Sequence, residues 1–250
     1  MATYDRKEIP FVPVIRVSTG IDELDWLYGN TDCHWGIPMK SMSLWAGESG
    51  TGKSRTAVSI CNSLAKDGHR ILYFQNEMDL GSFCRKIKYD SFRVSDSIGL
   101  KDMIEDIERD RPHFVVVDSI NMITEFRSGT KKDIEKIISP FREVCKTMGS
   151  HIIFLGQLNQ DGTIKGSTTL PHLVDIALNL QKGEDNGLFS ICVGMKHRFG
   201  RTGKSFFTIW EHTESGVNCI SQSRMLDELW KKKTTHVAPR RKRLFSLFSR

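Results

Sequence analysis

Apolar residues in this chain occur both in short uninterrupted runs and in longer stretches where they recur every three or four positions. The uninterrupted runs predict buried strands over residues 42–46, 71–74, 114–117 and 151–155. The helical spacing predicts helices beginning at Gly52, over 100–107 and over 134–148. Further strands are expected at 176–180, 188–195 and 205–210. Strands that alternate with helices form βαβ units, so we expect an α/β fold with a mainly parallel twisted sheet flanked by helices.

The two ends of the chain differ from this alternating body. Residues 1–16 are predicted to be an arm, because Pro10 and Pro13 interrupt an apolar stretch. Thr19, with Asp22 three positions later, predicts the cap of the first helix. The body is therefore expected to be one domain over 17–229, followed by a tail over 230–250.

Composition narrows the class of protein. Of the 250 residues, 39% are hydrophobic and 26% charged, which excludes collagen-like, wholly disordered and low-complexity chains. No apolar run is long enough for a membrane-spanning helix, and the first residues lack the apolar core of a secretory signal. The six cysteines are scattered without a CxxC pair, which argues against a zinc knuckle or a secreted disulfide scaffold. We expect a cytoplasmic protein with no membrane contact.

The net charge of +6 is concentrated at one end of the chain. Residues 231–250 contain eight Lys and Arg and no acid, and the rest of the chain has 28 basic against 30 acidic residues. The body is therefore close to neutral, and any nucleic-acid surface on it must be local.

A glycine-rich segment follows the first predicted strand. Its residues, Gly47-Glu48-Ser49-Gly50-Thr51-Gly52-Lys53-Ser54, match the P-loop pattern G-x-x-x-x-G-K-[ST]. Backbone N–H groups of such a loop bind phosphates at a helix N-terminus, the lysine reaches the β- and γ-phosphates, and the hydroxyl is a Mg²⁺ ligand. We therefore expect ATP and Mg²⁺ as ligands of residues 47–54 and of the adjoining Arg55.

Three polar residues follow other predicted strands. Asp118 ends the 114–117 strand, where an acid in a P-loop protein holds Mg²⁺. Glu77 follows the 71–74 strand, and a carboxylate there could activate the attacking water. Gln157 follows the 151–155 strand and could sense the γ-phosphate. On position alone, a solvated loop acid explains Glu77 equally well, and an ordinary polar loop residue explains Gln157.

Basic residues in loops are candidates for phosphate binding. Lys196 and Arg198 lie in a turn after the 188–195 strand, a placement that suits contact with a neighbour's nucleotide, although basic turns are usually only solvated. Two loops could bind DNA through phosphate contacts. Their candidate residues are Arg127, Lys131 and Lys132 in the first and Lys165 and Gly166 in the second.

Taken together, these motifs resemble the RecA-like ATPases, and most of all the motor core of the bacterial RadA (Sms) family. The resemblance covers about residues 17–212. Its stretches are 18–25, similar to an STGI-x-ELD entry helix; the P-loop; 156–166 with 172–175; and 196–200, similar to KNRFG with His197 in place of Asn.

The resemblance implies roles and partners. It makes Glu77 the catalytic glutamate and Lys196 and Arg198 residues that act on the neighbouring subunit's ATP. It implies a homo-oligomeric ring, a hexamer in that family, that drives branch migration on single-stranded or branched DNA. RadA proteins also carry a four-cysteine zinc domain and a Lon-like domain; this chain matches neither, which leaves ring assembly and the zinc domain's partner contacts open.

Two other readings stay open at this point. One is a RecA-type strand-exchange filament, and the other is a KaiC-like signalling ATPase that does not use DNA. The end of the tail, residues 244–248, is similar to peptides that dock on bacterial sliding clamps, and three of its five positions match. An electrostatic tail remains the default interpretation of that segment.

Overall fold

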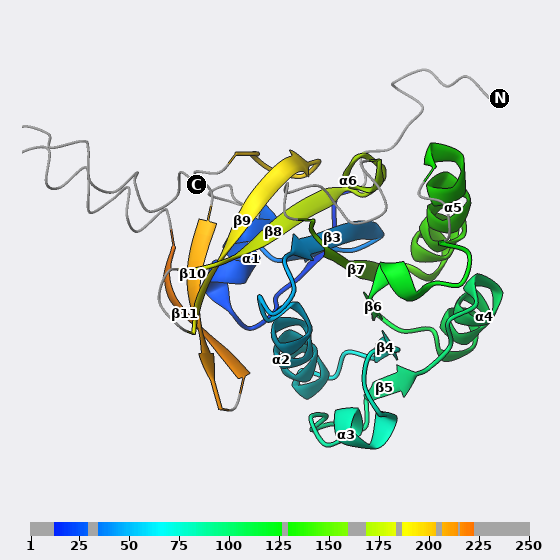
Figure 1. Cartoon of the computed structure of the whole chain (residues 1–250), viewed down its shortest axis with the longest axis horizontal. Coiled ribbons are helices and arrows are strands. Elements are labelled where there is room, and N and C mark those ends of the chain that lie inside the picture. The colour runs from blue at the N-terminus through cyan, green and yellow to red at the C-terminus, as the bar shows by residue number, and fades with distance from the viewer. Residues whose placement is uncertain are drawn as a thin grey trace, which may run out of the picture.

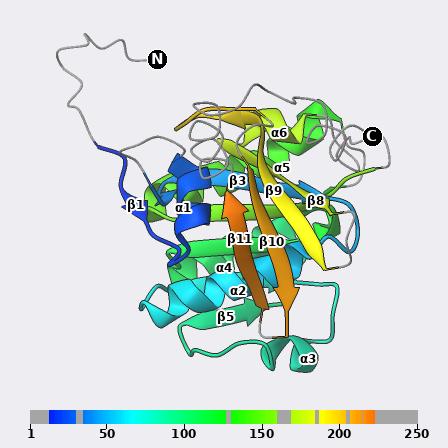
Figure 2. The same ribbon diagram turned by 90° about the vertical axis from the view of Figure 1, so that its left-hand side faces the viewer.

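The computed structural model describes residues 13–29, 35–126, 130–159, 169–183, 187–203, 207–214 and 216–222. One large sheet forms the centre of the described structure (Figure 1). In spatial order its nine strands are β11 (Gly216–Gln222), β10 (Phe207–Thr213), β9 (Leu188–His197), β8 (Ile176–Lys182), β3 (Ser41–Gly47), β7 (His151–Gln157), β6 (Phe114–Asp118), β4 (Ile71–Gln75) and β5 (Phe92–Ser95). The six strands from β8 to β5 are parallel, and β9, β10 and β11 add an antiparallel extension. Figure 2 turns this extension toward the viewer.

Helices cover both faces of the sheet, as the sequence predicts. Helices α1 (Asp22–Gly29) and α2 (Lys53–Lys66) pack on one face, and α4 (Leu100–Asp110) and α5 (Lys131–Met148) pack on the other. Strand β6 shows why a parallel strand needs no polar face: Phe114 and Val116 enter one apolar cluster, and Val115 and Val117 enter the other. The α/β prediction is confirmed.

Short elements complete the described chain. They are β1 (Arg16–Val17) paired with β2 (Ile37–Pro38), α3 (Leu80–Cys84), the 3₁₀ turn η1 (Ile120–Met122) and α6 (Leu170–Leu173). Within the described ranges, no helix combines the length and apolar character needed to cross a bilayer.

The start of α1 corrects one detail of the sequence prediction. The helix begins at Asp22, but the acid that is hydrogen-bonded to Thr19 is Asp25. Its carboxylate accepts the Thr19 N–H at 2.8 Å and the Thr19 hydroxyl at 2.7 Å. Asp25 is nearly buried, and this burial raises its pKa against the opposing effect of the hydrogen bonds. The carboxylate therefore fixes the chain entry from inside the fold and not from the exposed first turn.

A buried histidine at the start of β7 makes stability depend on pH. His151 is fully buried; its Nδ1 lies 2.9 Å from the Pro38 carbonyl, and its Nε2 lies 2.9 Å from the Ser43 hydroxyl. A carbonyl only accepts, so Nδ1 carries the proton and Nε2 accepts in the neutral ring. Burial lowers the pKa of His151 from 6.5 to about 4.

We therefore expect the free energy of unfolding to fall as the pH falls from about 6.5 to about 4. In that window the unfolded chain binds a proton at His151 that the folded chain does not, at a cost of about 3 kcal/mol by pH 4. Urea unfolding at several pH values measures this for the wild type and for His151→Asn. The variant should be less stable at pH 7 but less dependent on pH between 4 and 6.5; an equal slope in the two proteins contradicts the assignment.

Candidate active site

The P-loop connects β3 to α2, and its glycines are required by geometry. Gly50 and Gly52 have left-handed backbone angles, φ 75° and φ 84°. A Cβ on Gly47 would lie 2.6 Å from the Leu180 carbonyl of β8. Lys53 folds over the loop, and its Nζ donates to the carbonyl oxygens of Gly47 at 2.7 Å and Glu48 at 2.8 Å. The loop therefore holds the Lys53 ammonium against a backbone whose conformation at Gly47, Gly50 and Gly52 suits glycine.

A cavity of about 180 Å³ lies above this loop. It is lined by Ser49, Gly50, Gly52, Lys53, Ser54, Arg55, Glu77, Asp118, Ser119 and Gln157. The lining comes from segments that follow four neighbouring parallel strands, β3, β4, β6 and β7, and ligands of parallel sheets bind at that edge. The cavity is smaller than the roughly 300–1,000 Å³ of whole-ligand pockets, which fits the phosphate end of a nucleotide.

Asp118 and Ser54 form an oxygen-rich corner of this cavity. The Asp118 carboxylate is hydrogen-bonded to the Ser54 side chain and accepts the Tyr73 hydroxyl at 2.7 Å. Burial raises the pKa of Asp118, while these hydrogen bonds and the nearby Lys53 charge act in the opposite direction. A carboxylate beside a hydroxyl is the hard donor set that Mg²⁺ takes in phosphate sites, so these two side chains fit that ion.

The turn after β4 carries Glu77. The buried Gln75 side chain organises it, because its Oε1 accepts the N–H groups of Glu77 and Met78, and its Nε2 donates to the Met78 carbonyl. Glu77 itself is exposed and lines the cavity. Gln157 is the last residue of β7 and lies beside Gly47 in the strand register. The structure thus brings both residues to the P-loop, and their catalytic roles stay predictions.

Glu77→Gln is expected to bind ATP but hydrolyse it at least about 100-fold more slowly, because the amide keeps the shape and cannot accept a proton. Nucleotide affinity and steady-state hydrolysis of the purified variant measure the two effects separately. Glu108→Gln, an acid-to-amide change on the exposed face of α4, is the control. Hydrolysis by Glu77→Gln at the wild-type rate would show that another group activates the water.

The antiparallel extension contacts the P-loop from a direction that sequence patterns do not reveal. The His212 ring lies so close to Gly52 that a Cβ there would come within 2.0 Å of its Cε1 atom. Lys182, at the end of β8, reaches to 3.3 Å from the Cβ position of Gly50. The Arg55 guanidinium donates to the Thr213 carbonyl, so this expected nucleotide contact also braces the loop against β10. Lys182 adds a cation near the phosphate cavity that the sequence motifs do not indicate.

Lys196 and Arg198 lie at the opposite end of the sheet from the P-loop. Strand β9 is antiparallel to β8 and pairs His197 with Ile176, whereas Gly47 lies beside Leu180 at the other end of β8. Four residue steps along β8 separate Ile176 from Leu180, a distance of about 13 Å. These cations therefore do not reach the nucleotide site of their own chain.

The candidate DNA residues are only partly described. Lys131 and Lys132 are exposed in the first turn of α5, not in a loop. Arg127, Lys165, Gly166 and the basic tail lie outside the described residues.

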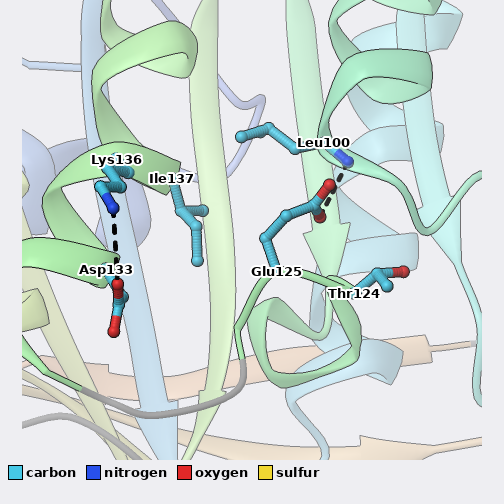
Figure 3. A pocket seen from close by; sticks show the side chains of 6 residues that line it. All are labelled: Leu100, Thr124, Glu125, Asp133, Lys136 and Ile137. Carbon is cyan, nitrogen blue, oxygen red and sulfur yellow. Dashed lines mark hydrogen bonds and ion pairs between the residues drawn. The ribbon is translucent and has the colours of Figure 1, made fainter.

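A second cavity, of about 440 Å³, lies between the starts of α4 and α5 (Figure 3). The Glu125 carboxylate there accepts the Leu100 N–H at 3.1 Å, and Lys136 is 3.9 Å from Asp133. None of the predicted nucleotide-binding residues lines this cavity.

Comparison with known proteins finds relatives in sequence and a similar solved structure. No protein-family model matches the chain. DNA repair protein RadA from Aquifex aeolicus is 26% identical over 216 residues, covering 83% of this chain and 47% of the relative. RadA from Mycobacterium tuberculosis (strain H37Rv) is 28% identical over 193 residues, covering 73% and 39%. A KaiC-like protein from Pyrococcus horikoshii superposes with a TM-score of 0.67 at 18% identity, over 84% of this chain and all of that one.

The chain resembles RadA in sequence and has a RecA-like P-loop ATPase fold. The expected resemblance is thereby confirmed. The chain spans less than half the length of these two RadA relatives. At 18% identity, the KaiC-like structure supports the RecA-like fold alone.

Proposed function

We propose that this RecA-like chain is an ATP-driven DNA-binding motor, a RadA-like translocase or helicase that acts on single-stranded or branched DNA in recombination, repair or replication. The observation that carries the proposal is the convergence of Lys53, Ser54, Asp118, Glu77 and Gln157 on one cavity at the carboxyl edge of the sheet. The sequence similarity to DNA repair protein RadA over most of the chain supports DNA as the partner.

Each residue at the cavity has a distinct part in ATP hydrolysis. The backbone of 47–54 and the Lys53 ammonium would bind the phosphates, and Ser54 and Asp118 would hold Mg²⁺, which supplies charge neutralisation on the phosphates. Glu77 would orient and deprotonate the attacking water. Gln157, at the end of a strand hydrogen-bonded to β3, would sense the γ-phosphate and transmit its state to the segment that follows β7.

Lys196 and Arg198 would complete the site of a neighbouring subunit. Their distance from their own P-loop supports action across an interface, in the manner of an arginine finger. A homo-oligomeric ring, hexameric as in the RadA resemblance, is the assembly that this arrangement favours.

Binding of labelled single-stranded DNA, measured with a non-hydrolysable ATP analogue, with ADP and without nucleotide, tests the DNA partner. We expect the tightest binding with the ATP analogue, because Gln157 would sense the presence of the γ-phosphate and transmit it to the segment that follows β7. Electron-microscopic imaging of the same complexes should show closed rings. Helical filaments would instead support a strand-exchange scaffold. Failure to bind single-stranded DNA in any of the three nucleotide states would contradict the proposal.

A further inference from the structure

Three cationic side chains contact the segment from α6 into β8. One comes from α5, and two come from the end of β9 and the residue that follows it. Lys196 of β9 donates from Nζ to the His172 carbonyl, and the guanidinium of Arg142 in α5 donates to the Leu173 carbonyl. Arg198 forms an ion pair with Asp175 at 2.8 Å. We call Arg142, Lys196 and Arg198 the cation cluster. Figure 1 shows α6 beside α5, and the two helices are in contact.

The cation cluster has more positive than negative charge. Its one carboxylate partner in this segment, Asp175, also accepts the Met42 N–H at 2.9 Å. Burial lowers the pKa of Lys196, the positive charges of Arg198 and Arg142 lower it further, and the Asp175 carboxylate acts in the opposite direction. Cations that disfavour each other's charge in this way are stabilised by a bound anion.

The geometry leaves donors available for that anion. A guanidinium has five N–H donors, and within the described part of the chain Arg142 donates to one carbonyl oxygen, that of Leu173. The Arg198 side chain is 62% exposed although its partner Asp175 is only 13% exposed. The cluster lies at the amino end of the parallel strands, so the anion is not the nucleotide of the same chain.

We propose that Arg142 is a third phosphate-binding cation, which acts with Lys196 and Arg198 on the polyphosphate of a nucleotide held by a second copy of this chain. The inference rests on the proposed function, because it requires an assembly in which this edge faces a neighbour's P-loop. It adds a residue from α5 that neither the P-loop nor the 196–200 stretch indicates. A guanidinium suits the role because its fork of donors matches phosphate oxygens.

Two substitutions separate phosphate binding from support of α6. Arg142→Gln removes the charge but keeps an N–H donor for the Leu173 carbonyl, whereas Arg142→Lys keeps the charge. We expect the Gln variant to lose about tenfold or more of the DNA-stimulated ATPase rate, the effect of losing a charge-assisted hydrogen bond, and the Lys variant to retain most of it. Lys101→Gln, a surface cation on α4 paired with Glu105, controls for loss of charge and should match the wild type.

Binding of a fluorescent, non-hydrolysable ATP analogue at low and high protein concentration supplies a second readout. Wild-type affinity should tighten as the chain assembles, and Arg142→Gln should lose part of this tightening while its low-concentration affinity is unchanged. Mixing Arg142→Gln with Lys53→Ala should restore hydrolysis, because some interfaces then combine an intact P-loop with an intact Arg142. Should the Gln variant fail to fold, Arg142→Met, which keeps most of the aliphatic stem, replaces it.

The outcomes distinguish this inference from the proposed function. An Arg142→Gln protein with wild-type rate and affinity, beside an inactive Arg198→Ala, overturns the role of Arg142 and leaves the motor intact. Loss of activity in Arg142→Gln without recovery in the mixture also overturns it, since the defect then lies within one chain. Normal DNA-stimulated hydrolysis by both Arg142→Gln and Arg198→Ala removes the cross-subunit site altogether.

Discussion

Lys53→Ala is expected to abolish ATP hydrolysis and leave the fold intact. The ammonium donates to the loop carbonyls of Gly47 and Glu48, and Lys53 belongs to neither apolar cluster, so its removal should open no cavity in the core. In the bound state the same ammonium would reach the phosphates, where charge develops during transfer. Loss of one such positioned charge should lower the rate by at least about 100-fold.

Steady-state hydrolysis and the thermal unfolding midpoint together measure this prediction. Lys66→Ala is the matched control, because it removes an exposed lysine from the last turn of the same helix, α2. The control should match the wild type in rate, and both variants should unfold within a few degrees of it. Hydrolysis by Lys53→Ala within a few fold of the wild type would mean that the 47–54 loop is not the nucleotide site.

Arg198→Ala is expected to keep nucleotide binding and lose turnover, by a factor on the order of 10³ if it acts as an arginine finger. Its guanidinium is far from the P-loop of its own chain and is held at the sheet edge by Asp175. Hydrolysis should therefore require assembly, and the specific activity of the wild type should rise with protein concentration. Arg198→Lys, which keeps a charge opposite Asp175, should lie between the wild type and the Ala variant.

Mixing Arg198→Ala with Lys53→Ala tests whether the finger acts in trans. Each variant is inactive alone, but in co-assembled mixtures some interfaces pair an intact P-loop with an intact Arg198. Partial recovery of hydrolysis is the expected result. An Arg198→Ala protein that hydrolyses normally with DNA present would refute the assignment, and co-assembled mixtures without recovery would count against a finger in trans.

Local sequence patterns predicted five of the six parallel strands, β3, β4, β6, β7 and β8, because each of these is a largely buried apolar run. They also placed Asp118 and Gln157 at strand ends, which parallel pairing then brings to one edge. The P-loop motif carries its own geometry, so its position could be read from residues 47–54 alone. Strand β5 was missed, because Phe92–Ser95 is short and only Phe92 in it is fully buried.

Contacts made across the sheet could not be predicted in this way. Nothing local to His212 or Lys182 indicates that β10 and the end of β8 bring these side chains against the P-loop. Tyr73 looked like one residue of an apolar strand, but its hydroxyl crosses to Asp118 on the neighbouring strand. Arg142 lies within α5, where the sequence shows only a polar position of an amphipathic helix, and only the fold places its guanidinium near Lys196 and Arg198.

The rate of ATP hydrolysis by the wild-type chain, with and without single-stranded DNA at one fixed protein concentration, tests the central claim most directly. Lys53→Ala measured in parallel sets the background from contaminating ATPases. A DNA-driven motor predicts Mg²⁺-dependent hydrolysis that single-stranded DNA stimulates several-fold and that Lys53→Ala lacks. Hydrolysis that depends on Lys53 but is the same with and without DNA would contradict the motor and favour a signalling ATPase that does not use DNA.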